Sequence, residues 1–217
     1  MFVLGITGGI GCGKTTAAAI LAAHGLPLLD ADVISHEVTA PGGVAIPEII
    51  ERFGPEYIKA DGSLDREAMA HTVFTDRKRL DQLSLIIHRH VMAEITRKRL
   101  LLQKQKAKAV VLDVPVPVRE GFLDSCDQIW VIWADLELRL GRLQARGLSR
   151  EEALRRMQIQ MTEDEYRALG TEFILNNGSV AELETQLDAL LNRELLGRGI
   201  PVQTGLVYAN EVSADSD

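Results

Sequence analysis

Two hydrophobic periods alternate along this chain, and they predict strands and helices in turn. Short apolar runs, typical of strands buried in a parallel sheet, occur at residues 2–6, 27–29, 109–114, 129–134 and 172–175. Helical spacing of apolar residues is found at 14–23, 65–73, 76–106, 136–146 and 180–196, and a further helix is expected after Ser149. The first strand, helix and strand form a βαβ unit, which implies a parallel sheet with right-handed crossovers.

The stretch from Val33 to Lys108 is almost entirely helical in pattern, with breaks at Pro41-Gly42-Gly43 and Asp61-Gly62. Its last part, 76–106, predicts one long helix or two abutting ones. A block of this length exceeds a simple crossover and indicates an inserted lobe. We therefore predict a domain over 1–198 followed by a flexible tail, with these parts: a core at 1–34, 109–135 and 171–198, a helical lobe at 35–108, a mainly helical segment at 136–170 and the tail at 199–217.

Composition narrows the class of protein. The 217 residues are 46% hydrophobic and 25% charged, as in ordinary globular proteins. The net charge of −7 argues against general nucleic-acid binding, in which phosphate contacts dominate affinity. The two cysteines, Cys12 and Cys126, match no zinc spacing and suggest a reducing compartment. No signal peptide or membrane-span-length apolar run is evident, so we expect a cytoplasmic protein that does not enter the membrane.

A glycine-rich motif follows the first predicted strand and fits the phosphate-binding pattern Gly-x-x-x-x-Gly-Lys-Ser/Thr. Residues 8–15, Gly8-Gly9-Ile10-Gly11-Cys12-Gly13-Lys14-Thr15, are here called the phosphate loop. Glycines let backbone N–H groups surround phosphate oxygens, and the positive end of the next helix faces the same anion. Lys14 would supply charge at the β- and γ-phosphates, and the Thr15 hydroxyl would bind Mg²⁺. A chance glycine-rich turn is disfavoured by the strand–loop–helix context. The predicted ATP-binding residues are Gly8, Gly9, Gly11, Cys12, Gly13, Lys14, Thr15 and Thr16.

Three aspartates at strand ends are candidate catalytic groups. Asp113 closes an apolar strand and would hold Mg²⁺ beside the phosphate loop, or it simply ends the strand. Asp30 and Asp32 follow the second strand, where a carboxylate can accept the proton of an attacking hydroxyl. Alternatively, one of the two caps the helix that begins near Val33. We assign the base to Asp32.

Arginines are concentrated in the 136–170 segment, where a planar guanidinium is suited to clamping phosphate. Arg142 and Arg146 are the predicted catalytic arginines, and the others are interpreted as a solvated face balanced by glutamates. The seven arginines are Arg139, Arg142, Arg146, Arg150, Arg155, Arg156 and Arg167.

Taken together, these motifs resemble the dephospho-CoA kinase family over about residues 2–195. The resemblance is carried by the segment 6–15, by Asp30-Ala31-Asp32, by Phe53-Gly54, by residues 61–66, by Phe74 and by Asn177-Gly178. It implies an α/β P-loop NTPase fold, three-layered around a parallel sheet of five strands, with a helical acceptor-binding insertion for CoA and a lid at 136–170.

The resemblance also implies an activity, its cofactors and its partners. The chain would use ATP and Mg²⁺ to phosphorylate the 3′-hydroxyl of dephospho-CoA, which is the last step of coenzyme A biosynthesis. Asp32 would act as base, Asn177 would lie near the adenine, and His88 and Pro115 would line the acceptor site. The partners would be dephospho-CoA and ATP, without nucleic acid, for a monomer or weak homo-oligomer.

The chain departs from the family pattern at three places. His88 is followed by Arg89 rather than proline, the segment 115–119 has Pro117 and places Arg119 where glutamate is expected, and Gly170-Thr171 replaces an Ala-Asp pair. We interpret 115–119 as lining the acceptor side and 170–171 as lining the nucleotide side. Two alternatives therefore stay open: a kinase of another small hydroxyl compound or nucleotide, and a nucleotide-binding regulatory protein without turnover. A GTPase or an ABC-type ATPase is disfavoured, because neither Asn-Lys-x-Asp nor Leu-Ser-Gly-Gly-Gln occurs.

Overall fold

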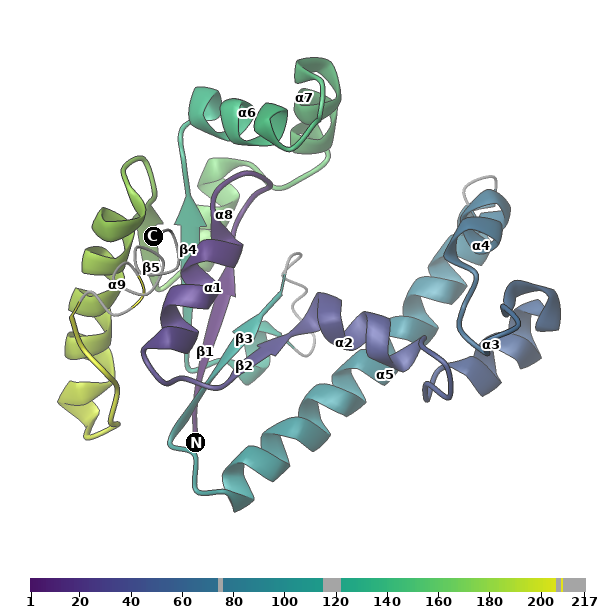
Figure 1. The fold of residues 1–217 in the computed structure, drawn as a ribbon, viewed down its shortest axis with the longest axis horizontal. Coiled ribbons are helices and arrows are strands. Elements are labelled where there is room, and N and C mark those ends of the chain that lie inside the picture. Colours follow the sequence, from purple (N-terminus) through teal and green to yellow (C-terminus); the bar gives the residue numbers. More distant parts are fainter. Residues whose placement is uncertain (74–75, 115–121, 206–207, 209–217) are drawn as a thin grey trace, which may run out of the picture. The chain divides into compact units, whose positions relative to one another are not determined.

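The computed structural model describes residues 1–73, 76–114, 122–205 and 208 (Figure 1). Phe74, Pro115 and the rest of the 115–119 segment lie outside the described residues. The chain divides into two compact units, one made of residues 1–29 and 105–217 and the other of residues 30–104. Within the described residues, no helix is long and apolar enough to cross a membrane.

A five-stranded parallel sheet forms the centre of the first unit, which confirms the predicted α/β fold class. The strand order is β2-β3-β1-β4-β5. The second strand lies one residue later than predicted, and the first extends one residue further. The bounds are β1 Phe2–Thr7, β2 Leu28–Asp30, β3 Ala109–Asp113, β4 Gln128–Trp133 and β5 Glu172–Leu175.

Helices cover both faces of this sheet, which gives the predicted three layers (Figure 1). On one face, α1 (Lys14–Ala23) and α9 (Val180–Glu194) pack against Leu4, Ile6 and Trp130. On the other face, Tyr166 of α8 (Glu163–Leu169) packs against Val131 and Trp133. Trp130 is fully buried and Trp133 nearly so, as expected of core residues.

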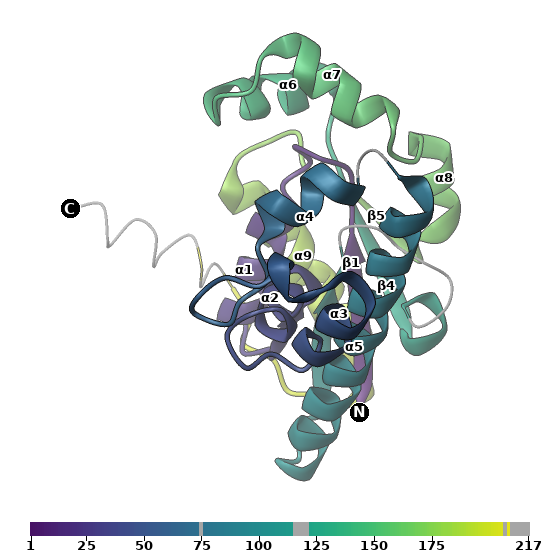
Figure 2. The ribbon, with the colours of Figure 1, turned by 90° about the vertical axis from the view of Figure 1, so that its right-hand side faces the viewer.

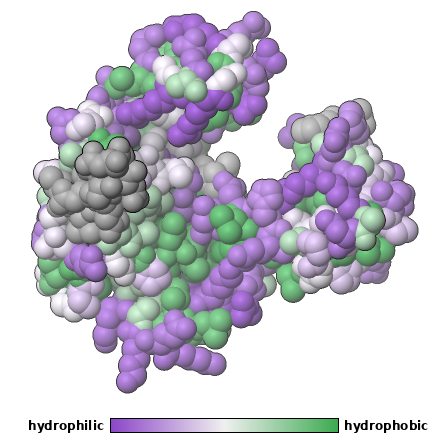
Figure 3. Space-filling view, in the orientation of Figure 1, coloured by the Kyte–Doolittle hydropathy of each residue, from purple (hydrophilic) through white to green (hydrophobic). Residues whose placement is uncertain are grey.

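Two further helices belong to the 136–170 segment, α6 (Leu136–Ala145) and α7 (Arg150–Gln158). They pack on each other through Leu140, Leu143 and Ala153. Their outward surface is largely hydrophilic (Figure 3). Four of the seven arginines form surface ion pairs with glutamates: Arg150, Arg155 and Arg156 of α7, and Arg167 of α8. For these four, the interpretation as a solvated face is confirmed.

Helix α8 was not predicted, although its start carries a sequence signal. Thr162 and Glu165 form a capping box, in which each side chain bonds to the other residue's backbone N–H. The Thr-x-x-Glu spacing at 162–165 would have located this helix.

The second unit, residues 30–104, is helical (Figure 2). It has its own buried side chains. The predicted 76–106 helix is one continuous element, α5, capped by Asp76. Asp65 caps α4. The bounds are α2 Ala31–Val38, α3 Ile46–Phe53, the 3-10 turn Pro55–Tyr57, α4 Arg66–Val73 and α5 Arg77–Lys104.

The beginning of the predicted tail, 199–205, packs on the first unit, as does Tyr208. The Nδ1 atom of His24 lies 2.6 Å from the backbone oxygen of Gln203, and Gln203 donates its N–H to the His24 carbonyl at 3.0 Å. Tyr208 donates its N–H to Glu184 at 2.6 Å, and its side chain packs against the core. The expectation of a flexible tail from residue 199 is therefore wrong for these residues, because buried His24 and Glu184 provide fixed partners for the segment.

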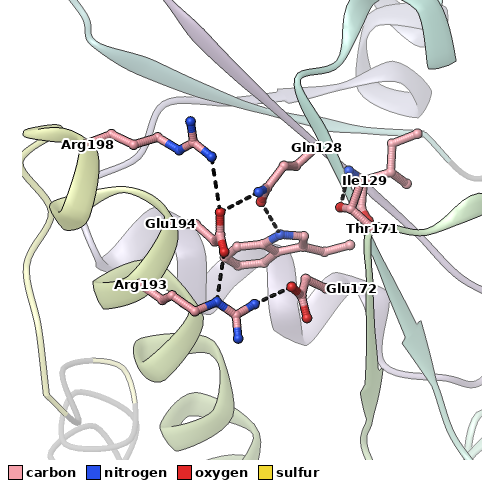
Figure 4. A network of polar contacts seen from close by, with 8 residues as sticks. Gln128, Ile129, Thr171, Glu172, Arg193, Glu194 and Arg198 are labelled. Carbon is pink, nitrogen blue, oxygen red and sulfur yellow. Dashed lines mark hydrogen bonds and ion pairs between the residues drawn. The ribbon is translucent and has the colours of Figure 1, made fainter.

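A polar network joins the beginnings of β4 and β5 to the end of α9 (Figure 4). Trp130 donates its indole N–H to Gln128 at 3.0 Å, and Gln128 donates to Glu194. Arg193 contacts both Glu172 and Glu194. The network lies at the opposite edge of the sheet from the phosphate loop, so its role is to hold the last helix on the sheet.

Thr171 lies at this same edge and corrects one prediction. Its hydroxyl accepts the Ile129 N–H at 3.0 Å and contacts the Ile129 carbonyl at 2.9 Å. The Gly170-Thr171 departure was assigned to the nucleotide side, but it precedes β5, whereas the phosphate loop follows the carboxyl end of its strand. Thr171 instead fixes the register between β4 and β5.

Glu194 gives a test of the network through its acid dependence. Hydrogen bonds from Arg193 and Gln128 hold the pKa of this carboxyl below its ordinary value of 4.5. A carboxyl with a lowered folded-state pKa stabilises the fold above its ordinary pKa, and the contribution is lost as pH falls through the lowered value. We expect Glu194→Gln to lower the melting temperature by about 1–3 °C near neutral pH, with no difference from the parent below the lowered pKa.

The measurement is thermal unfolding followed by circular dichroism across this pH range. Glu151→Gln is the matched control, because Glu151 forms an exposed i,i+4 pair with Arg155 on α7. A melting-temperature difference for Glu194→Gln that persists unchanged in acid would contradict the assigned role of the carboxylate.

Candidate nucleotide-binding site

The phosphate loop connects β1 to α1, as the motif requires. Gly13 is the residue before α1 and has φ of 92°, a left-handed conformation that favours glycine. A Cβ there would lie 2.1 Å from Nδ2 of Asn176. Among the described residues, no side chain caps α1, a feature that it shares with α3 and α6, whereas Asp30, Ser149, Thr162 and Ser179 cap other helices. The first N–H groups of α1 are therefore available to an anion.

Lys14 and Asp113 meet beside this loop. The Lys14 ammonium forms an ion pair with the Asp113 carboxylate at the end of β3. Asp113 is 3% exposed, so its charge is held by close partners rather than by water. The two predicted residues from distant parts of the sequence are thus brought together, because parallel strands β1 and β3 end at the same edge.

Thr15 and Thr16 belong to the first turn of α1, where Thr15 is exposed and Thr16 half-buried. Hydroxyl and carboxylate oxygens are the ligands that Mg²⁺ prefers, so Thr15 and Asp113 are chemically suited to hold it together with phosphate oxygens. Among the described residues, no group of three His, Cys, Asp or Glu side chains forms a candidate cation site.

The backbone of the phosphate loop is held by side chains from outside it, among them those of Asn176 and Arg142. Asn176, which follows β5, donates its side-chain N–H to the Cys12 carbonyl at 2.9 Å. Arg142 of α6 donates to the carbonyls of Gly11 and Cys12, at 3.3 and 3.4 Å, and to that of Asn176 at 2.9 Å. Arg142 was predicted at this site, whereas Asn176 was not.

Two other contacting residues, Arg139 and Gln160, were not assigned to the site. The interpretation of Arg139 as part of a solvated face is wrong, because this residue is only 6% exposed. Arg139 donates from Nε to the Ile10 carbonyl, and Gln160 accepts the Ile10 N–H. Asn176 could have been predicted at this site because it directly follows the last predicted strand and precedes Asn177, the residue that was predicted to bind the nucleotide. Arg139 could have been found because it lies one turn before Arg142 on the same face of its helix. For Gln160 the sequence offers no such signal, since it acts on a backbone group distant in the chain.

Cys12 occupies the loop as a buried free thiol. Burial raises the pKa of this thiol, and the charge of Arg139 opposes the rise only in part. The side chain packs with Trp133 and Tyr166. Cys12 is therefore a neutral group beneath the loop and adds no negative charge where phosphate would bind.

Arg146 and Asn177 are placed differently from Arg142 and Asn176. Arg146 is the exposed C-cap residue that follows α6, one turn beyond Arg142. Asn177 is also exposed, and its side-chain oxygen accepts the Asp135 N–H at 3.0 Å. Their predicted contacts with the nucleotide stay predictions.

In the second unit, the two aspartates at the junction of β2 and α2 have distinct roles. The Asp30 carboxylate accepts the N–H groups of Asp32 and Val33, at 2.8 and 3.1 Å, and so caps α2. Asp32 lies in the first turn of α2 and is exposed. The alternative that one of the two aspartates caps the helix therefore applies to Asp30. The Asp32 carboxylate takes no part in this cap.

His88 is exposed on α5, and its neighbours Arg89 and His90 bind the same carboxylate. Arg89 forms an ion pair with Glu48 of α3, and Nε2 of His90 lies 2.8 Å from Glu48. These contacts hold the pKa of Glu48 below its usual range. Arg89, where the family has proline, thus links α5 to α3. Pro115 lies outside the described residues.

Comparisons with known proteins agree with this geometry. A family model for dephospho-CoA kinase matches residues 2–182. The dephospho-CoA kinase of Symbiobacterium thermophilum is 39% identical over 92% of this chain and 84% of its own length. That of Corynebacterium glutamicum is 36% identical, with coverages of 86% and 96%.

Solved structures give the same picture. TT1252 from Thermus thermophilus is 36% identical with a TM-score of 0.70, over 89% of this chain and 97% of its own. Dephospho-CoA kinase from Campylobacter jejuni has a TM-score of 0.67 over 88% and 96% of the two chains; at 24% identity this likeness shows the fold alone.

Asn176 provides a test of the loop's construction. Asn176→Ala removes the side-chain N–H that donates to the carbonyl of Cys12, so this carbonyl loses that hydrogen bond. We expect the free energy of unfolding to fall by about 1–3 kcal/mol, measured by urea denaturation. Asn177→Ala is the control, because its bond lies on an exposed side chain. Equal losses for the two variants would contradict the role given to Asn176.

Proposed function

Because this chain belongs to the dephospho-CoA kinase family, we propose that it transfers the γ-phosphoryl group of ATP to the 3′-hydroxyl of dephospho-CoA, giving CoA and ADP. The observation that carries this proposal is the ion pair between Lys14 and Asp113 beside an uncapped helix N-terminus. A cation, backbone N–H donors and a carboxylate at one sheet edge are the parts that bind and activate a nucleoside triphosphate.

Lys14 and the phosphate loop would bind the β- and γ-phosphates. The first-turn N–H groups of α1 add their dipole to this attraction. Arg142, already at the loop carbonyls, would place a further positive charge beside the transferring group, and Arg146 would join it from the next turn of α6. Fixed charges of this kind stabilise the transition state without having to reorganise.

Thr15 and Asp113 would hold Mg²⁺, together with phosphate oxygens and water. The ion supplies neutralising charge to the phosphate groups when bound. Lys14 would then exchange its contact with the Asp113 carboxylate for contact with phosphate. The carboxylate would keep a positive neighbour throughout, which avoids the cost of an unpaired buried charge.

Asp32 would accept the proton of the attacking 3′-hydroxyl. Its carboxylate is exposed, while Asp30 is committed to the cap two residues before it. His88 and Pro115 would contribute to acceptor binding, and Asn177 to binding of the adenine. We also propose a cytoplasmic enzyme, monomeric or weakly associated, whose partners are ATP and dephospho-CoA.

The direct test is ADP release by the purified protein with ATP and Mg²⁺, comparing 3′-dephospho-CoA with a panel of nucleoside monophosphates. We expect turnover with dephospho-CoA and none with the nucleoside monophosphates. Turnover only with another acceptor would overturn the acceptor assignment, and ATP binding without turnover on any acceptor would overturn the enzymatic one.

Asp32→Asn tests the base. We expect turnover to fall by about 10²–10⁴-fold, as for the loss of a general base, while ATP affinity stays near that of the parent. Asp30→Asn is the matched control, because asparagine keeps the capping oxygen and is an equally good N-cap. Steady-state rates and ATP titrations of both variants make the comparison. Unchanged turnover in Asp32→Asn would remove Asp32 from this role.

A further inference from the structure

Ile10 of the phosphate loop contacts residues of the 136–170 segment through its N–H, its carbonyl and its side chain. Its backbone N–H is donated to the side-chain oxygen of Gln160 at 2.8 Å. Its carbonyl accepts a hydrogen bond from Nε of Arg139 at 2.9 Å. Its side chain packs with the apolar cluster formed by Leu140, Leu143 and Ala153 of α6 and α7.

Arg139 is an unusual donor because its charge is buried. Only 6% of the residue is exposed, and its guanidinium lies 4.5 Å from the ring centre of Trp133. A buried cation is costly unless its environment fixes and compensates it. The indole face and the Ile10 carbonyl provide that environment, so the guanidinium has a single well-defined position against the loop.

The backbone of α6 also approaches the loop closely. A Cβ at Gly11, whose φ is 79°, would lie 3.0 Å from the Arg139 carbonyl oxygen. Gln160, which follows the end of α7, contacts the loop at the neighbouring residue Ile10. The loop is therefore contacted by both ends of the α6–α7 hairpin within two consecutive residues.

We propose that Arg139 and Gln160 are positioning residues that act through Ile10 to set the phosphate loop for ATP, so that the loop and the α6–α7 hairpin respond to the nucleotide as one unit. The inference rests on ATP as the ligand of the loop in the proposed function. It assigns no contact with substrate to either residue. By linkage, if the hairpin contacts raise ATP affinity, bound ATP must stabilise the hairpin contacts by the same factor.

The experiment uses the full chain and the variants Arg139→Met, Gln160→Met and their combination, with Gln158→Met as control on exposed α7 surface. ATP affinity is measured by calorimetry without any acceptor, and amide exchange of Ile10 by NMR. Each single variant is expected to weaken ATP binding by about three- to tenfold, the effect of one lost backbone hydrogen bond. Gln160→Met is expected to speed Ile10 exchange, and Gln158→Met to change neither value.

Two further readouts separate positioning from general stability. The double variant should lose less affinity than the product of the single losses, since both residues act on the backbone of the same residue, Ile10. Arg139→Lys, which keeps the charge and a donor, should recover part of the loss. In steady state, KM for ATP should rise while KM for dephospho-CoA stays within about twofold, as expected when only nucleotide binding is affected.

Multiplicative losses in the double variant, or ATP affinities of both single variants within about twofold of Gln158→Met, would overturn the proposal. If Arg139→Met fails to fold, Arg139→Lys and Gln160→Met carry the same comparison. The binding and exchange measurements need no acceptor. Failure of dephospho-CoA turnover with normal ATP binding would therefore count against the proposed function and leave this inference standing on its own data.

Discussion

The phosphate loop imposes the constraint on which the first unit is built: the N–H groups at the start of α1 must stay available to an anion while the carbonyls of the loop are held in place. The side-chain caps found at other helices are missing from α1 among the described residues. The loop's carbonyls are instead bound by Arg139, Arg142 and Asn176. These donors come from α6 and from the end of β5, so the sheet order and the α6 packing both serve the loop.

Electrostatics at the loop follow from the same arrangement. Lys14 and Asp113 lie at neighbouring strand ends and form a pair, which keeps a nearly buried carboxylate compensated. Cys12 remains neutral because burial raises its pKa. The net result is a site whose fixed charges are mainly guanidinium and ammonium groups, as an ATP-binding site requires.

The departures from the family pattern that fall on described residues have structural explanations. Arg89 and His90 both contact Glu48, which joins α5 to α3 in the second unit. Thr171 bonds both backbone groups of Ile129 at the sheet edge away from the phosphate loop. Neither substitution alters the residues that contact the loop. They are variations in how helices and strands are held together.

Local chemistry determined much of this protein from sequence alone. The strand–loop–helix motif, the strands that end at Asp30 and Asp113, and the long α5 all follow from short-range spacing and apolar period. What the sequence could not decide depends on contacts between distant residues. Arg139 binds the carbonyl of Ile10 and Gln160 binds its N–H, Asn176 rather than Asn177 supports the loop, and Gln203 bonds to His24. Such partners are fixed only when the sheet order brings separate segments together, because a backbone carbonyl carries no sequence signal that identifies its donor.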